Sequence, residues 1–230
     1  MEYVFENPIE MPRGSHYGSD YWIAYSYKLK RIAHLYSILE YANFITLEMN
    51  YKVKYFCEQP VKIEDINNSI GKKSSVLDFW VQYTNGSCEF QEIKYSTDLV
   101  GTSESSIRSQ KQVEFQRNWC LNNNYNYRIV TEKDLYTGQF IIQNLELLHS
   151  HLLNYNQMAT NLPENLIKIL CDHNLTISEI QSLQILPEKY ELSILAHQYY
   201  KGNIDIVNLK DRPLDQYSEV KLCEKKDTIS

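Results

Sequence analysis

The sequence has few of the residues that interrupt a fold. Only 7 of its 230 residues are glycine and 6 are proline, which argues against a linker-rich or disordered chain. Hydrophobic residues make up 43% of the chain, and 19 residues are tyrosine, so there is enough apolar surface for a substantial core. We therefore expect a globular protein with one large domain or two small ones.

Long apolar runs and an apolar leader are also missing. No stretch approaches the roughly 18 apolar residues of a membrane-spanning helix. The first residues, MEYVFENPIEMPRGSHYGSDYW, lack the basic start and apolar centre of a secretory signal. The 5 cysteines are widely spread without a CxxC pair, so neither a disulfide framework nor a zinc site is indicated. We expect a cytoplasmic protein with reduced thiols and no membrane anchor.

Positive charge is in short supply. The chain has 23 Lys and Arg residues against 29 Asp and Glu residues, which gives a formal net charge of −6 and a pI of about 5.6. A nucleic-acid binder that acts alone and binds tightly usually has a positive field, and this chain as a whole lacks one. If the protein acts on DNA, we expect partners to hold it there.

Hydrophobic periodicity predicts an α/β arrangement for the first part of the chain. The predicted elements are a strand at 21–29, a helix at 30–50, a strand that bends at Pro60, a hairpin at 75–96, a helix capped by Ser103 or Ser105, and a short strand beginning YNYRIV. This order predicts an α/β (α+β) core with a mixed central sheet flanked by helices. We assign it, with an N-terminal extension, to residues 1–145.

Residues 146–230 show a different order of patterns. Three helical stretches are followed by two short strands around Asp211, Arg212 and Pro213, which is the order of a winged helix. We predict a small C-terminal winged-helix-like domain, with a plain helical appendage as the alternative. Glu188 and Glu191 on the third helix make a poor surface for reading bases, so we expect this domain to dock a protein.

The hairpin SSVLDFWVQYTNGSCEFQEIKY carries charges at strand positions, and its register decides where they point. A two-residue turn would set Asp78 opposite Ile93. A three-residue loop with Gly86 in the left-handed conformation sets Asp78 opposite Glu92, and then Asp78, Glu92 and Lys94 share one face of the sheet. Turn chemistry allows both registers. We predict the second one for the chemical reason that follows.

Two adjacent carboxylates repel each other unless positive charge lies between them. A divalent cation meets that need, and oxygen ligands suit Mg²⁺, with Mn²⁺ as a substitute. Two such ions stabilise the attacking and leaving oxygens of an in-line displacement, while Lys94 orients or polarises the attacking water. Asp78, Glu92 and Lys94 together are therefore the minimum apparatus for phosphodiester hydrolysis.

A third carboxylate is expected from the first helix. Within about 40° of Glu40 on a helical wheel lie only apolar or aromatic neighbours: Ala33, Tyr36, Phe44 and Leu47. Glu48 is rotated about 80° away and is expected to reach solvent. We therefore predict that Glu40, Asp78 and Glu92 bind the metal ions.

The plain alternative is that these are ordinary strand charges on a solvated face. An Asp followed at a distance by Glu-x-Lys is a short and common pattern, and most such matches carry no chemistry. A solvated face explains Gln82 and Glu89 well, but it explains Glu40 badly.

Three blocks of the sequence together resemble a known family. SILEYANFITLEMNYKVKYFCEQPVKI, VLDFWVQYTNGSCEFQEIKY and VEFQRNWCLNNNYNYRIVTEKDL are similar to the TnsA endonuclease subunit of heteromeric cut-and-paste transposases, a branch of the PD-(D/E)xK nuclease superfamily. The similarity covers residues 25–135 in several blocks in the right order, which is more specific than a lone Glu-x-Lys.

The resemblance implies a restriction-endonuclease-like core and a role for each site residue. By its motif Glu40 is the helix carboxylate, Asp78 the central metal ligand, Glu92 the second strand ligand and Lys94 the catalytic lysine. Some members have glutamine at the position of Glu92. Leu77 stands where the motif usually has proline, a departure that the superfamily tolerates.

The resemblance also implies partners. A TnsA-like subunit cuts the 5′ strands at transposon ends in prokaryotes, while a DDE transposase (TnsB-like) cuts and joins the 3′ ends and an AAA+ ATPase (TnsC-like) couples them to target choice. A nuclease delivered by partners needs little phosphate affinity of its own, so the acidic pI is compatible with it. The rivals are a restriction or repair nuclease that acts alone and an inactive nuclease-fold scaffold.

Two groups of basic residues could line a DNA path or simply be solvated helix faces. They are Lys28, Lys30 and Arg31 at the entry to the first helix, and Arg108, Lys111 and Arg117 on the helix after the hairpin.

Overall fold

The computed structural model describes residues 5–11, 20–64, 74–153 and 161–223. The chain divides into two compact units. Unit 1 consists of residues 1–48 and 52–135, and unit 2 consists of residues 49–51 and 136–230.

The sequence pattern predicts that the first domain ends at residue 145, whereas the two compact units of the structure divide between Leu135 and Tyr136. The reason is the position of helix α4 (Ile141–Leu153), which packs against α7 (Glu191–Tyr200) of unit 2. None of the helices in the described ranges has both the length and the apolar character that crossing a bilayer requires.

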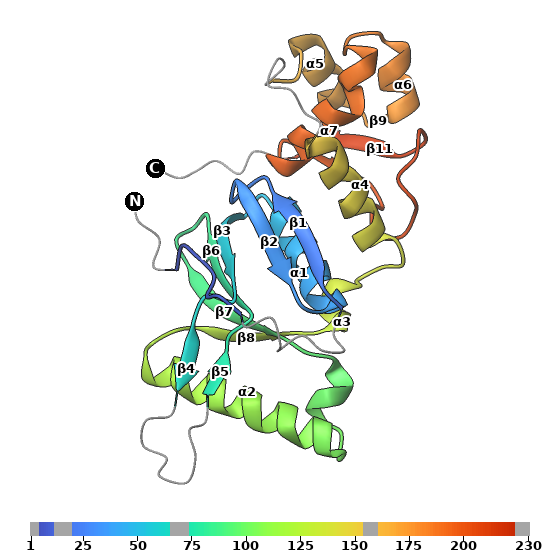
Figure 1. Ribbon diagram of the computed structural model, residues 1–230. Helices are drawn as coiled ribbons and strands as arrows, with labels where there is room; N and C mark the ends of the chain where they lie inside the picture. Colours follow the sequence, from blue (N-terminus) through green and yellow to red (C-terminus); the bar gives the residue numbers. More distant parts are fainter. Residues whose placement is uncertain (1–4, 12–19, 65–73, 154–160, 224–230) are drawn as a thin grey trace. The chain divides into compact units, whose positions relative to one another are not determined.

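Unit 1 is a mixed α/β structure (Figure 1). Its elements are β1 (Trp22–Ser26), β2 (Arg31–Leu35), α1 (Ile38–Met49), β3 (Val53–Glu58), β4 (Lys62–Glu64), β5 (Ser74–Val76), β6 (Phe79–Tyr83), β7 (Cys88–Ile93), η2 (Ser96–Leu99), α2 (Glu104–Asn122), β8 (Tyr127–Val130) and α3 (Glu132–Leu135). The central sheet has the order β3-β6-β7-β8, in which β7 and β8 are parallel and the other neighbours are antiparallel. The predicted mixed sheet flanked by helices is confirmed.

One face of the central sheet packs against α2, which runs along it in Figure 1. Because side chains alternate along a strand, Cys57, Trp80 and Phe90 from three adjacent strands point to this side. They form one buried cluster with Cys120 of α2, and the partly buried Trp119 packs against it. The ring centroids of Phe90 and Trp119 lie 6.0 Å apart in an edge-to-face arrangement.

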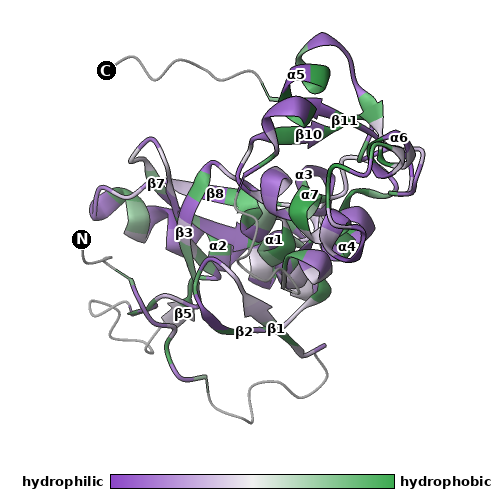
Figure 2. Ribbon diagram, turned by 90° about the horizontal axis from the view of Figure 1, so that it is seen from above, coloured by the Kyte–Doolittle hydropathy of each residue, from purple (hydrophilic) through white to green (hydrophobic). Residues whose placement is uncertain are grey.

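The opposite face of the sheet packs against α1. Phe44 of α1 meets Phe56 edge to face at 5.7 Å, and Phe56 in turn contacts Phe79. The hairpin β1–β2 also contacts α1, where Trp22 stacks on Tyr41 at 4.6 Å. Helix α1 is largely hydrophobic, as its colour in Figure 2 indicates, whereas the residues of α2 are largely hydrophilic.

The hairpin β6–β7 has the predicted register. Phe79 pairs with Gln91, and the backbone N–H of Tyr83 donates to the carbonyl of Ser87 at 2.9 Å. Gly86 has a φ of 85°, the left-handed conformation that the three-residue loop requires. The side chains of Asp78, Glu92 and Lys94 are thereby set on one face, which the alternative turn would have prevented.

The prediction of one helix over residues 30–50 is wrong in its first part. Arg31–Leu35 is strand β2, which pairs antiparallel with β1, and only Ile38–Met49 is helical. Lys30 has a φ of 57° and its N–H donates to the carbonyl of Ser26 at 3.0 Å, so the chain reverses there. In RIAHL the buried Ala33 and Leu35 alternate with more exposed neighbours, which is the period of a strand. Five residues are too few to distinguish this period from that of a helix.

The prediction that Glu48 reaches solvent is also wrong. Glu48 is fully buried, and its carboxylate accepts hydrogen bonds from the Ser26 hydroxyl at 2.5 Å and from the Lys28 backbone N–H at 2.9 Å. The turn between β1 and β2 folds over the end of α1 and supplies these donors. The wheel could not show this, because the residues of the turn had been assigned to a strand over 21–29 and those of β2 to the helix.

Unit 2 contains α4, α5 (Glu164–Asp172), β9 (Leu175–Thr176), α6 (Ile177–Ser182), η3 (Glu188–Tyr190), α7, β10 (Ile204–Ile206) and β11 (Glu219–Leu222). The three strands form an antiparallel sheet in the order β10-β11-β9. Its core gathers apolar side chains from the helices and the sheet, among them Leu166, Ile180, Ile194 and Val220. The winged-helix assignment stays a prediction.

Candidate active site

Asp78 lies at a bend that two neighbouring segments share. The β3–β6 pairing ends at this point and the β4–β5 pairing begins. The N–H of Gln59 donates to the carbonyl of Asp78 at 2.8 Å, and the N–H of Leu77 donates to that of Val61 at 3.2 Å, so the two segments bend together. One carboxylate oxygen of Asp78 accepts the N–H of Ile93 at 2.7 Å, which aims the side chain at β7.

Glu92 and Lys94 meet Asp78 from β7 and the residues that follow it. Lys94 Nζ lies 2.8 Å from Oε1 of Glu92, which is fully buried. The carboxyl groups of Asp78 and Glu92 are close enough for a hydrogen bond between them. The N–H of Lys94 donates to the carbonyl of Val130, so β8 holds this end of the strand. The structure therefore brings together the three predicted strand residues.

Glu40 reaches the same cluster from the first turn of α1, but most of its contacts are local. Its Oε2 accepts the backbone N–H of Tyr36 at 3.1 Å and the side-chain amide of Gln59 at 3.2 Å, and its Oε1 accepts the hydroxyl of Ser37. The Ser37 hydroxyl in turn accepts the N–H of Glu40 at 3.1 Å. This reciprocal arrangement resembles a capping box, so Glu40 also stabilises the start of α1.

The electrostatics show that the four side chains act on one another. Burial raises the pKa of Glu40 to about 8, and the charge of Asp78 adds to the shift. Burial and Asp78 likewise raise the pKa of Glu92 to about 8, and burial raises that of Asp78. Burial opposes the charge of Lys94, but Asp78 and Glu92 outweigh it and raise the pKa of Lys94. Three carboxyl groups thus face one ammonium, and positive charge is in deficit.

The carboxyl groups are not arranged as a ready-made ligand set. In the part of the chain that the structure describes, no group of three or more His, Cys, Asp or Glu side chains is spaced to hold a metal ion. Glu40 is turned toward the N–H of Tyr36, and Glu92 toward Lys94. Metal binding by Glu40, Asp78 and Glu92 therefore stays a prediction.

Sequence reasoning missed the side chains that surround Glu92. Gln112 and Gln116 of α2 donate their amides to the two carboxylate oxygens of Glu92, at 3.0 and 2.9 Å. A signal was present in the segment QKQVEFQ, because residues four apart lie on one face of a helix. Nothing in the sequence showed that this face meets β7.

The basic residues divide into two groups with different surroundings. Near the turn of β1–β2, Lys28 Nζ donates to the carbonyl of Glu48 and Arg31 forms a two-pronged pair with the buried Glu58, at 2.5 and 2.8 Å. These residues precede or begin β2, so the predicted place at a helix entry is wrong. The residues predicted on the second helix are exposed on α2: Arg108, Lys111 and Arg117.

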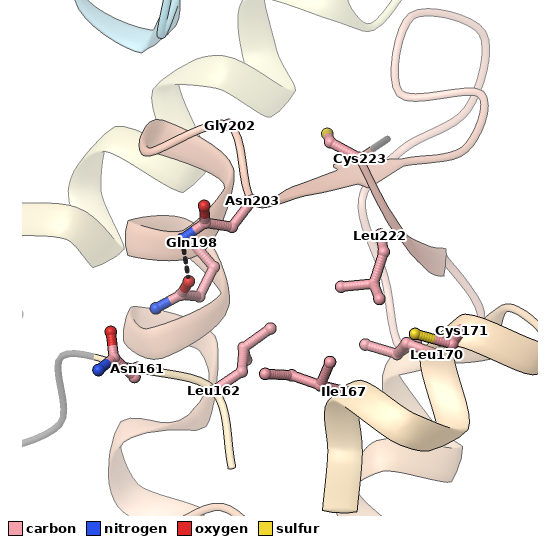
Figure 3. Close-up of a pocket in the computed structure, with 10 residues that line it drawn as sticks. All are labelled: Asn161, Leu162, Ile167, Leu170, Cys171, Gln198, Gly202, Asn203, Leu222 and Cys223. Carbon is pink, nitrogen blue, oxygen red and sulfur yellow. Dashed lines mark hydrogen bonds between the residues drawn. The ribbon is translucent and has the colours of Figure 1, made fainter. Parts of the chain in front are cut away.

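Unit 2 contains a cavity of about 740 Å³ between α5, α7 and β11, shown in Figure 3. Apolar side chains such as Leu162, Ile167 and Leu222 point into it, and the amide of Asn203 donates to that of Gln198 at 2.7 Å. Among the described residues that line it there is no carboxylate, histidine or lysine. The groups that phosphodiester hydrolysis needs are instead gathered in unit 1.

Comparison with known families agrees with this location. Residues 50–132 match the family described as TnsA-like endonuclease N terminal. The matched segment contains Asp78, Glu92 and Lys94, whereas Glu40 precedes it. A search of the curated proteins finds no match. The cluster in unit 1 thus lies largely within a segment that is similar to the N-terminal domain of TnsA-like endonucleases.

Proposed function

We propose that this protein is a metal-dependent DNA endonuclease that makes the 5′-strand cuts at transposon ends. The observation that carries the proposal is the contact among Asp78, Glu92 and Lys94 inside a TnsA-like endonuclease domain. It works with a DDE transposase that processes the other strand and with an AAA+ ATPase that regulates the assembly. Both partners are inferred from the family.

The donor set fits a hard divalent cation such as Mg²⁺ or Mn²⁺. Asp78, Glu92 and Glu40 offer only carboxylate oxygens, and their raised pKa values reflect the lack of positive charge among them. When bound, one or two such ions would polarise the scissile phosphate and stabilise the leaving oxygen. Asp78 and Glu92 would hold the cation, and Glu40 would join them by giving up a contact at the start of α1.

Lys94 supplies the remaining positive charge. Its ammonium is mostly buried, with 18% of the side chain exposed, and the surrounding carboxylates keep it protonated. In this state Lys94 can donate a hydrogen bond to a phosphate oxygen or hold the attacking water, but it cannot act as a base. We assign it an orienting and charge-stabilising role.

Unit 2 is proposed to be a winged-helix-like domain that docks a protein partner. The order of three helices, α5, α6 and α7, before the strands β10 and β11 supports the domain type. Seven of the 10 residues of α7 are buried, and α4 packs against it. A helix enclosed in this way is not available to enter a DNA groove, which favours the transposase or the ATPase as the ligand of this unit.

The rivals differ in what purified protein does alone. A restriction or repair nuclease would cleave plasmid DNA in Mg²⁺ without added subunits, and a scaffold would cleave nothing in any mixture. The TnsA-like assignment predicts cleavage only when the co-encoded transposase and ATPase are present.

The test is a reconstituted excision reaction with transposon-end DNA, in which the 5′ and 3′ cuts are mapped separately. Lys94→Ala and Asp78→Ala should abolish the 5′ cuts while the 3′ cuts and the co-purification of partners persist. Lys133→Ala, an exposed lysine on α3, is the matched control and should cut normally. If Lys94→Ala and Asp78→Ala lose partner binding but still cut, the proposal is wrong.

A further inference from the structure

The surroundings of Glu92 limit how it can bind a cation. Its side chain is fully buried. Oε1 accepts from Lys94 Nζ at 2.8 Å and from the Gln112 amide at 3.0 Å, and Oε2 accepts from the Gln116 amide at 2.9 Å. A carboxylate has about four lone-pair positions, two on each oxygen. Oε1 is therefore filled, and the one position that remains on Oε2 is where the neighbouring carboxyl group of Asp78, or a cation shared with it, can approach.

The two glutamines are themselves fixed. The Tyr127 hydroxyl donates to Oε1 of Gln116 at 2.7 Å, which leaves the amide nitrogen of Gln116 facing Glu92. The Ser75 hydroxyl accepts from both amides, at 3.2 Å from Gln112 and 2.9 Å from Gln116. Gln116 is fully buried. Helix α2 and the strands β5 and β8 thus contribute to one hydrogen-bond network whose centre is Glu92.

The choice of glutamine has a physical consequence. An arginine or a second lysine in these places would hold Glu92 equally well but would cancel its negative charge. An amide is a neutral donor, so it fixes the direction of the carboxylate and leaves the charge for a cation. Hydrogen bonds of this kind to metal-binding groups typically contribute 10- to 100-fold, roughly, to metal affinity.

We infer that Gln112 and Gln116 are positioning residues that hold Glu92 with only Oε2 open, so that Glu92 offers a divalent cation a single oxygen. This inference rests on the proposed function, because it assumes a cation beside Asp78 and Glu92. It adds two residues outside the predicted set and states which atom of Glu92 binds. A single-oxygen ligand suits the small octahedral Mg²⁺ and Mn²⁺ better than Ca²⁺, which readily takes carboxylates in pairs of oxygens.

The test is calorimetric titration of the full-length protein with Mn²⁺ in the absence of DNA. Gln116→Met removes the donor at nearly constant volume and should weaken Mn²⁺ binding by about 10- to 100-fold. Gln112→Met should give a smaller loss. Gln110→Met is the matched control, because Gln110 lies on the same helix but donates to the carbonyl of Gly101 at 2.8 Å, and its affinity should equal that of the wild type.

Tyr127→Phe keeps the inference testable if Gln116→Met fails to fold. It removes only the hydroxyl that orients Gln116, and it should lower Mn²⁺ affinity by several-fold without a loss of far-ultraviolet circular dichroism. Wild-type affinity in Tyr127→Phe and in a folded Gln116→Met would overturn the inference. Asp78→Ala tests the cation site separately from the role of the glutamines. If the wild type binds Mn²⁺ and Asp78→Ala does not, the cation site is supported even when the glutamine variants bind normally. If the wild type binds no Mn²⁺, both the proposed function and the inference fail.

Discussion

Burying the carboxyl groups of Asp78 and Glu92 side by side destabilises the folded protein. Their carboxyl groups lie within hydrogen-bond reach of each other, and burial raises the pKa of both. Only one ammonium, that of Lys94, is close enough to form an ion pair with Glu92 among the contacts of the described residues. A site shaped for stability alone would replace one carboxylate with a neutral group, because like charges in a low dielectric destabilise the folded state.

If the buried pair destabilises the folded state, Asp78→Asn should stabilise the metal-free protein. The amide keeps an oxygen that can accept the N–H of Ile93 and removes one charge from the cluster. We expect the free energy of unfolding, measured by urea denaturation in EDTA, to rise by about 1 kcal/mol. Asp98→Asn, a change of the same kind in η2, is the control and should lie within about 0.5 kcal/mol of the wild type. A less stable Asp78→Asn variant would show that the pair is not under electrostatic strain.

At the scale of elements, the hairpin β6–β7 shows what a sequence can reveal. Its register follows from Gly86, from the alternation of side chains and from the chemistry that joins Asp78 to Glu92, all of which are local. The segment 30–50 shows the limit. RIAHL is too short for its period to separate strand from helix, and its pairing with β1 is visible only in three dimensions.

The residues of the candidate site show the same difference between local and long-range information. Asp78, Glu92 and Lys94 lie in one hairpin and were predicted, whereas the contacts of Gln112 and Gln116 with Glu92 join segments about 20 residues or more apart. Glu40 was chosen partly because Ala33 and Tyr36 seemed to share its helix face, and neither residue is helical. Glu40 does lie beside the cluster, but the helical-wheel argument that predicted this position was partly incorrect.

Helix α2 carries the two glutamines, so its start bears on the site. The structure selects Ser103 as the N-cap, since its hydroxyl accepts the N–H of Ser106 at 3.2 Å. Ser103→Ala should lower the free energy of unfolding by about 1 kcal/mol in urea. Ser105→Ala, two residues away and exposed, should change it by less than about 0.5 kcal/mol. Equal losses in the two variants would mean that the cap is shared or misassigned.

At the scale of the whole molecule, the cation site can be located by asking which of the two units a bound cation stabilises. The predicted ligands all belong to unit 1. A ligand that binds the folded state at 100 times its dissociation constant adds about 2.7 kcal/mol to the stability of the unit that holds it. In scanning calorimetry, Mn²⁺ should therefore raise the unfolding temperature of unit 1.

The transition of unit 2 provides an internal control, because none of the predicted ligands lies in it. Asp78→Ala should abolish the Mn²⁺ effect on unit 1. A shift that persists in Asp78→Ala, or that appears only in the transition of unit 2, would place the cation elsewhere. Leu166→Ala, in the core of unit 2, identifies that transition by lowering its temperature.

The central proposal is that Asp78 and its neighbours perform cation-dependent DNA cleavage. The most direct measurement is strand-specific mapping of cuts at transposon ends by the reconstituted subunits, with wild-type protein and with Asp78→Asn, in Mg²⁺ and in EDTA. We predict that the wild type makes 5′-strand cuts in Mg²⁺ but not in EDTA, and that the folded Asp78→Asn variant makes none in either. Cuts by Asp78→Asn, or cuts by the wild type in EDTA, would contradict it.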